Sequence, residues 1–306
     1  MSELHILNVG RADCAVFLLD TPEGTRTVVV DGGEKFHEGR RPLLDFLTQR
    51  RIFSIDLLIL THLHQDHFGG FFHLIDQVDV QHAVAPTGDL QFANCVYPVF
   101  GNKEYYREYH QFFEYLERNG TELMHSFDCV GKIFSFGEFQ LECLYPLAGS
   151  PMRSIYYAQA LCNPELTDEA MNYVLNIYKQ ICNEDSSIWL LRKNGKDLIL
   201  LAGDSTDESM RAALCGREIH PWLQKLSHHG INSRYFSTYV QELLSPQILV
   251  VNVSSGIAKL IKRVTVAAQE IAAGKFDVTL SVKSKDEVGQ LAQAFNQTLK
   301  RLIKSI

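Results

Sequence analysis

The sequence predicts an α/β layered domain that is followed by two amphipathic helices. Strand-like and helical segments alternate along most of the chain, and one buried strand leads directly into a cluster of histidines. After Gly256, apolar residues recur every three or four positions instead. Alternation of strands and helices is typical of layered α/β domains, and the later spacing is typical of amphipathic helices. Domains are therefore predicted at residues 1–255 and 256–306.

Apolar periodicity and turn residues predict the elements of the first domain in order. Hairpin turns are expected at Thr21-Pro22-Glu23-Gly24, at Phe136-Gly137-Glu138 and at Asn194-Gly195. Strands are predicted at Leu4–Val9, Ala15–Leu19, Thr27–Val30, Asp56–Leu60, Lys132–Tyr145 (a pair), Ser187–Arg192, Asp197–Leu201, Leu223–Leu226 and Gln247–Val253. Helices are predicted at Leu43–Arg50, Tyr105–Arg118, Thr167–Lys179 and Ser205–Leu214.

The segment after Gly256 has its own apolar pattern and its own charge. One apolar stripe runs from Ile257 to Ile271 and a second from Val288 to Leu302. This segment holds nine Lys/Arg against four Asp/Glu, whereas the whole chain has a net charge of −7. Such asymmetry supports a domain boundary near Gly256, and stripes of this kind predict helix association.

Composition excludes several classes of protein. With 46% hydrophobic and 21% charged residues, the chain resembles an ordinary globular protein, and its net charge of −7 argues against coating of nucleic acid. The longest apolar runs have the length of strands, so no membrane span is expected. Seven cysteines without a C-x-x-C pair indicate reduced thiols and a cytoplasmic location.

A cluster of potential metal ligands lies in the segment Thr61–His67. His62 and His64 are two residues apart at the end of a predicted strand, so their imidazoles are expected on one face. Asp66 and His67 follow at a turn. Burying four such side chains would be costly without a cation, and imidazole with carboxylate suits zinc, manganese or iron.

This cluster resembles the H-x-H-x-D-H motif of the metallo-β-lactamase superfamily, whose αββα sandwich holds two metals at one edge. Further motifs follow in that superfamily's order: Val30-Asp31-Gly32-Gly33, Leu201-Ala202-Gly203-Asp204 and Leu226-Ser227-His228-His229-Gly230. Val9-Gly10-Arg11-Ala12-Asp13 and Asn183-Glu184-Asp185-Ser186 are similar to motifs of one branch, that of competence DNA-uptake hydrolase domains and phosphorylcholine esterases. The resemblance covers about Met1–Val253 and implies the αββα metallo-β-lactamase fold.

The resemblance implies a site for two divalent metal ions, zinc or else manganese or iron. The first ion would take His62 and His64, and the second would take Asp66 and His67. Asp204 would lie between the two ions.

Two adjacent histidines are expected to complete the site. One of His228 and His229 would be a metal ligand, and the other would contact the substrate. Asp66 and His229 are the residues expected to take part in catalysis. Asp31 either orients a metal-binding histidine or is a simple turn carboxylate.

The sequence also departs from the family pattern in two places. The mid-chain histidine ligand has no clear counterpart, because His125 is isolated and Asn183 or Asp185 could take its place. The Gly-His-Pro motif and closing helix that normally follow a segment such as Val250-Val251-Asn252-Val253 are replaced by the amphipathic segment.

The last segment, about Ile257–Ser305, resembles a HAMP signalling module. The resemblance rests on Glu270-Ile271-Ala272-Ala273-Gly274-Lys275-Phe276-Asp277, Asp286-Glu287-Val288-Gly289-Gln290-Leu291 and Phe295-Asn296. In that family two helices from each of two chains form a four-helix bundle. A homodimer through the C-terminal helices is therefore implied.

The predicted function is a metal-dependent hydrolase in which a binuclear site activates water. Its expected substrate is a phosphodiester or phosphomonoester, either a small molecule or a nucleic acid, and no membrane partner is expected. The alternative is a catalytically weak or inactive hydrolase-fold sensor that dimerises through the HAMP-like helices. A third, purely structural interpretation makes those helices a lid that replaces the missing closing helix.

Overall fold

The computed structural model describes residues 1–86, 103–147, 153–161, 165–230 and 237–252. The chain divides into two compact units, Met1–Asn252 and Val253–Ile306. The two helices predicted after Gly256 lie outside the described residues, so everything below concerns the first unit.

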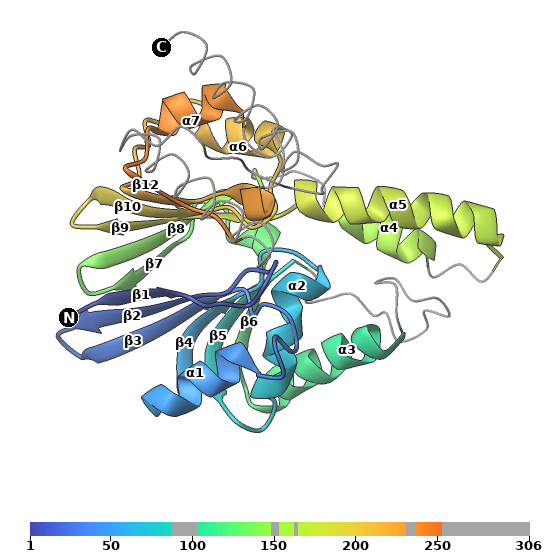
Figure 1. Ribbon diagram of the computed structural model, residues 1–306, viewed down its shortest axis with the longest axis horizontal. Coiled ribbons are helices and arrows are strands. Elements are labelled where there is room, and N and C mark those ends of the chain that lie inside the picture. The colour runs from blue at the N-terminus through green and yellow to red at the C-terminus, as the bar shows by residue number, and fades with distance from the viewer. Residues whose placement is uncertain (87–102, 148–152, 162–164, 231–236, 253–306) are drawn as a thin grey trace, which may run out of the picture. The chain divides into compact units, whose positions relative to one another are not determined.

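Two six-stranded sheets form the centre of this unit and stack face to face (Figure 1). The first sheet has the order β1-β2-β3-β4-β5-β6, and the second has the order β12-β11-β10-β9-β8-β7. The strands of the first sheet are β1 (Glu3–Ile6), β2 (Ala15–Thr21), β3 (Gly24–Val30), β4 (Ser54–Ile59), β5 (Asp79–Ala85) and β6 (Glu122–His125). Those of the second are β7 (Ile133–Phe136), β8 (Phe139–Tyr145), β9 (Ile188–Lys193), β10 (Lys196–Leu201), β11 (Leu223–Lys225) and β12 (Ile248–Val250).

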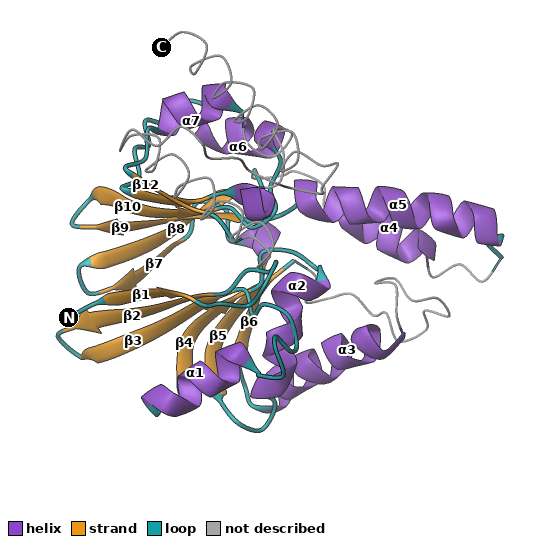
Figure 2. Ribbon diagram, viewed as in Figure 1, coloured by secondary structure: helices purple, strands orange, loops and turns teal. Residues whose placement is uncertain are grey.

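Helices cover the outer faces of both sheets, α1 and α3 on the first and α6 and α7 on the second (Figure 2). Helices α4 and α5 pack against each other and extend away from the sheets. The helices are α1 (Pro42–Arg50), α2 (Gln65–Phe68), α3 (Lys103–Arg118), α4 (Arg153–Leu161), α5 (Asp168–Glu184), α6 (Asp207–Leu214) and α7 (Thr238–Leu244).

Three apolar cores correspond to the three interfaces between these layers. One lies between the first sheet and its helices, and includes Phe68, Phe71 and Phe112. The second lies between the sheets around Trp189, and the third joins the second sheet to α6 and α7 around Met210. Each sheet is therefore buried on both faces, which explains the near-continuous apolar runs of its central strands. The predicted αββα sandwich is confirmed.

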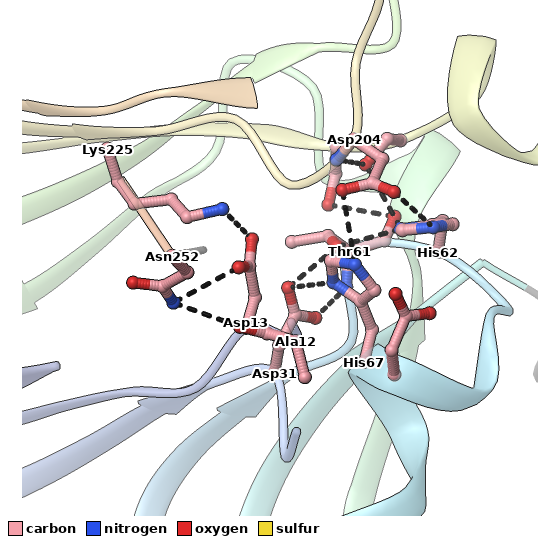
Figure 3. A network of polar contacts seen from close by, with 12 residues as sticks. Ala12, Asp13, Asp31, Thr61, His62, His67, Asp204, Lys225 and Asn252 are labelled. Carbon is pink, nitrogen blue, oxygen red and sulfur yellow. Dashed lines mark hydrogen bonds and ion pairs between the residues drawn. The ribbon is translucent and has the colours of Figure 1, made fainter. Parts of the chain in front are cut away.

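Strand direction determines where the functional loops gather. Strands β3, β4, β5 and β6 run parallel to one another, as do β10, β11 and β12. In open α/β sheets, ligands bind outside the carboxyl ends of such strands. The loops that leave β3, β4, β10 and β11 carry the four sequence motifs and lie at one edge of the sandwich, where Figure 3 shows several of their residues together.

Most of the predicted elements are present, with ends shifted by one to three residues or, at the end of α5, by five. All three predicted hairpin turns connect paired antiparallel strands. The sequence did not lead us to expect β5, β6, α2, α4 or α7. None of the described helices combines the length and the apolar character needed to cross a membrane.

Candidate metal centre

The histidine cluster follows β4 but is not part of it. The strand ends at Ile59, so the expectation that His62 and His64 share one face of a strand is wrong. A loop folded against the second sheet brings the two rings together instead, with centroids 4.6 Å apart. Asp66 and His67 lie in α2, a single helical turn.

The Asp204 carboxylate lies between two groups of imidazoles. Its Oδ2 is 3.7 Å from His62 Nε2 and 3.6 Å from His228 Nε2. Its Oδ1 is 3.2 Å from His67 Nε2 and 3.7 Å from His229 Nε2. One carboxylate oxygen thus faces each side of the site.

Gly203 gives Asp204 this position. Its φ is +48°, and a Cβ there would collide with the hydroxyls of Ser186 and Thr61. The close approach allows the backbone N–H of Asp204 to donate to Ser186 Oγ at 3.1 Å. Ser186, the last residue of the Asn-x-x-Ser motif, therefore holds the bridging carboxylate and lies 3.4 Å from His62 Nδ1.

Asp31 orients the ring of His67, which is the first of the two roles considered for it above. Its carboxylate accepts hydrogen bonds from the Thr61 N–H (2.8 Å), the Thr61 hydroxyl (2.9 Å) and His67 Nδ1–H (2.8 Å; Figure 3). Because Nδ1–H is donated to Asp31, Nε2 is the nitrogen of His67 that faces Asp204 and is available to a metal ion.

His228 and His229 follow β11 in left-handed backbone conformations, with φ values of 47° and 56°. Non-glycine residues rarely adopt such conformations, and they persist at functional sites where the surrounding structure imposes them. The ring of His229 is fully buried, with Nε2 3.1 Å from Asp66 Oδ2. Its Nδ1 is 3.0 Å from Asp13 Oδ1, a contact that the sequence analysis missed although Asp13 ends a motif that it had singled out.

The donor atoms form two compact sets that fit divalent cations. One set is His62, His64 and Asp204, and the other is Asp13, His67, Asp204 and His229. The Nε2 atoms of His62 and His64 are buried and have no hydrogen-bond partner among the described residues. Buried polar atoms are normally satisfied, so orphaned imidazole nitrogens beside a carboxylate are what a metal site requires.

Burial and neighbouring carboxylates divide the histidines electrostatically. Burial lowers the pKa of His64 to about 4 and lowers that of His62 well below its usual value. Burial also disfavours the charged form of His67, but Asp204 and Asp31 outweigh it and raise its pKa well above the usual value. Neutral His62 and His64 have the protonation state that metal binding needs.

The proposed substitutes for a mid-chain histidine are outside both sets. Asp185 Oδ2 accepts a hydrogen bond from the Ser154 N–H at 2.8 Å, so this carboxylate caps the start of α4. His125 ends β6, where its ring accepts from the Phe127 N–H. Asn183 is buried at the end of α5 and does not belong to either set.

A hollow of about 650 Å³ opens beside the second set of donors. Asp66, His228 and His229 are among its lining residues, together with the charged residues Arg11, Lys35 and Glu34. The side chain of His228 is 22% exposed, whereas that of His229 is 2% exposed. The hollow therefore gives a solute access to the donors through His228 and Asp66.

Two family models match the chain. Residues 9–126 match the metallo-beta-lactamase superfamily and residues 253–304 match the HAMP domain, which confirms both resemblances. No curated protein is similar enough to the chain to be identified as a relative.

Similar solved structures share low sequence identity with the chain. Igni18, described as a novel metallo hydrolase from Ignicoccus hospitalis KIN4/I, is 13% identical, with 88% of this chain and 92% of that one covered and a TM-score of 0.45. A diphosphatase from the PhnP family is 12% identical, with coverage of 79% and 73% and a TM-score of 0.40. The CmlA beta-hydroxylase E377D mutant is 16% identical over 82% of this chain, with a TM-score of 0.43, but this chain spans only 46% of its length.

Proposed function

Because the chain has the metallo-beta-lactamase fold and matches that superfamily, we propose that it is a hydrolase that binds two divalent metal ions and cleaves a phosphoester. The Asp204 carboxylate carries this proposal, since its two oxygens face two separate sets of imidazoles. A carboxylate placed in this way is suited to bridge two cations.

The ligands divide between the two positions as follows. His62 and His64 bind the first ion, His67, Asp66 and His229 bind the second, and Asp204 binds both. His229 is favoured over its neighbour as the ligand because its buried Nε2 lies near both Asp66 and Asp204. His228 does not belong to either compact set and lines the hollow, so it contacts the substrate.

Two divalent ions a few ångströms apart supply an activated water and Lewis acidity for the leaving oxygen. The residues of the chain orient the donor side chains and shield them from bulk water. Thr61 Oγ1 donates to Asp31 and lies 3.2 Å from His62 Nδ1, from which it can accept. This arrangement keeps the proton of His62 on Nδ1 and leaves Nε2 available as a ligand.

The hollow supports an anionic substrate. Arg11 is an exposed residue that lines it, and its guanidinium makes no hydrogen bond or ion pair with another described residue, whereas Lys35 pairs with Glu108. A guanidinium offers a planar set of donors that matches phosphate oxygens. A phosphodiester or phosphomonoester placed there would lie beside Asp66, His228 and His229. Imidazole and carboxylate ligands suit zinc, and also manganese or iron.

Metal counting together with hydrolysis tests the proposal. Purified protein should hold close to two transition-metal ions per chain and hydrolyse bis(p-nitrophenyl) phosphate. His64→Ala and Asp204→Ala should lose metal and activity, whereas His220→Ala, an exposed histidine away from both sets, should behave as wild type. A protein without metal, or activity unaffected by the first two substitutions, would contradict the proposal.

The HAMP match favours a second function for residues 253–304. We propose that this segment makes the protein a homodimer. The alternative to an enzyme is a sensor that has the hydrolase fold, has little or no catalytic activity, and dimerises through this segment. Multi-angle light scattering should give a mass that rises toward that of a dimer with concentration. A mass that stays at 34.7 kDa at high concentration would exclude the dimer.

A further inference from the structure

Behind His229 lies a buried clamp, by which we mean Asp13, Lys225 and Asn252. Asp13 and Lys225 are each only 4% exposed. Lys225 Nζ pairs with Asp13 Oδ2, and the Asn252 amide donates to Asp13 Oδ1 at 3.2 Å and to the Ala12 carbonyl at 3.0 Å (Figure 3).

The clamp joins parts of the fold that are remote in sequence. Asp13 lies in the loop before β2 of the first sheet, Lys225 ends β11 of the second, and Asn252 follows β12. The Asp13 N–H also donates to the Asp66 carbonyl at 3.2 Å, which ties the same loop to α2. The clamp thus positions Asp13 relative to both sheets and to the helix that carries Asp66.

Asp13 is close enough to His67, Asp204 and His229 to belong to their donor set. Its oxygens are nevertheless already used. Oδ2 is paired with Lys225, and Oδ1 accepts from Asn252 and lies 3.0 Å from His229 Nδ1. A cation that recruited Asp13 would compete with a buried ammonium and an imidazole, and a buried charge that loses its partner is costly. The contacts of Asp13 are those of a residue that orients a ligand.

We propose that Asp13, held by Lys225 and Asn252, is a positioning residue that directs His229 Nε2 toward the second metal ion. This inference rests on the proposed binuclear function. Because Asp13 accepts a hydrogen bond from Nδ1–H, Nε2 is the nitrogen of His229 that faces Asp66 and Asp204 and would bind the ion. Lys225 stabilises the buried Asp13 as a carboxylate, the form that accepts this hydrogen bond most strongly.

The first experiment measures metal binding rather than turnover. Wild type and variants are titrated with Co²⁺ against a competing chelator, and the second ion is identified as the one that His67→Ala loses. Asp13→Ala should lower the affinity for the second ion by about 10- to 100-fold and change the absorption spectrum of Co²⁺ bound there. The affinity for the first ion should stay the same. Asp13→Asn should lose less of this affinity, because its amide oxygen can still accept a hydrogen bond from His229 Nδ1–H. Lys225→Met should also weaken only the second ion.

A double-mutant cycle tests whether Asp13 acts through His229. Residues that act as one unit are not additive. In a His229→Ala background, Asp13→Asn should therefore have no further effect on the second ion. A full additional loss would mean that Asp13 acts by another route and would overturn the inference.

The control is Glu142→Gln, which alters a half-buried carboxylate that pairs with Arg192 and Arg217, away from the site. It should leave both affinities unchanged. If wild type binds no metal, the proposed function fails. If wild type binds two ions and folded Asp13→Asn and Asp13→Ala bind the second ion as wild type does, or lose both ions equally, only the positioning role fails.

Discussion

The two sides of the metal centre differ in what supports their imidazoles. On the second side, His67 and His229 each have a carboxylate at Nδ1, Asp31 at 2.8 Å and Asp13 at 3.0 Å. On the first side, the described partners of His62 Nδ1 are hydroxyls, those of Thr61 at 3.2 Å and Ser186 at 3.4 Å. A carboxylate fixes ring direction and makes the ligand more basic than a hydroxyl does. We therefore expect the second metal ion to depend more strongly on its supporting residues.

The same difference is visible in the charges of the rings. Both sides are buried, yet burial and then the neighbouring imidazoles lower the pKa of His62, whereas two carboxylates overcome burial and raise the pKa of His67. Burial is thus common to both sides, and the placement of Asp31 and Asp204 makes the histidine pKa values of the two sides different. Removing one supporting group at a time should therefore change the affinity for one ion more than the affinity for the other.

The largest effect is expected from Asp31→Ala. The change leaves the Thr61 N–H and hydroxyl and His67 Nδ1–H without their acceptor, so the free energy of unfolding should fall by about 3 kcal/mol. The second ion should bind about 10- to 100-fold more weakly. Urea unfolding and Co²⁺ competition measure the two effects. Asp56→Ala, which removes a carboxylate that binds Arg26 and the Thr27 N–H, should lower stability without changing metal affinity.

A smaller effect, shared by both sides, is expected from Gly203→Ala. The new Cβ would meet Ser186 and Thr61 in a left-handed backbone conformation, at a cost of about 2 kcal/mol in unfolding free energy. Because Asp204 follows directly, both ions should weaken. Gly195→Ala is the matched control, since it has a positive φ but no atom near its Cβ. If the two variants unfold at the same urea concentration, crowding at Gly203 is unimportant.

Ser186→Ala should affect mainly the first side. The Asp204 N–H loses its acceptor and His62 loses one weak contact, so we expect about 1 kcal/mol of destabilisation. In the Co²⁺ titration, the affinity for the first ion should fall more than the affinity for the second. Ser205→Ala, which removes another buried hydroxyl and its contact with Ser227, controls for loss of a hydroxyl. A selective loss of the second ion in Ser186→Ala would contradict the contrast between the two sides.

The smallest structural effect is expected from His228→Asn. Asparagine tolerates the left-handed conformation well, so the free energy of unfolding should change by less than about 0.5 kcal/mol. Both ions should remain bound, while the KM for bis(p-nitrophenyl) phosphate rises because a substrate contact is lost. Loss of one ion in this variant would make His228 a ligand. His220→Asn, which alters an exposed histidine, is the control for KM.

Local sequence was sufficient for elements whose signals are local. The turn at Asn194-Gly195 and the capping of α5 by Thr167, whose hydroxyl accepts from the Ala170 N–H, can both be recognised within a few residues. Strand β6 has only four residues, three of them half-buried, and therefore shows little periodicity. Helix α7 is also short, and nothing in its seven residues distinguishes it from a loop before its packing is known.

The sequence by itself determined the kind of site, because His62, His64, Asp66 and His67 are adjacent and their ligand chemistry does not depend on the fold. It also placed Asp31, Asp204 and His228-His229 in recognisable motifs. Only the tertiary structure decided how these residues are shared between the two sides. Asp13 and Lys225 are 212 residues apart, and their pairing behind His229 arises from the packing of the two sheets. No local pattern encodes such a contact, since burial and charge compensation exist only after the sheets have come together.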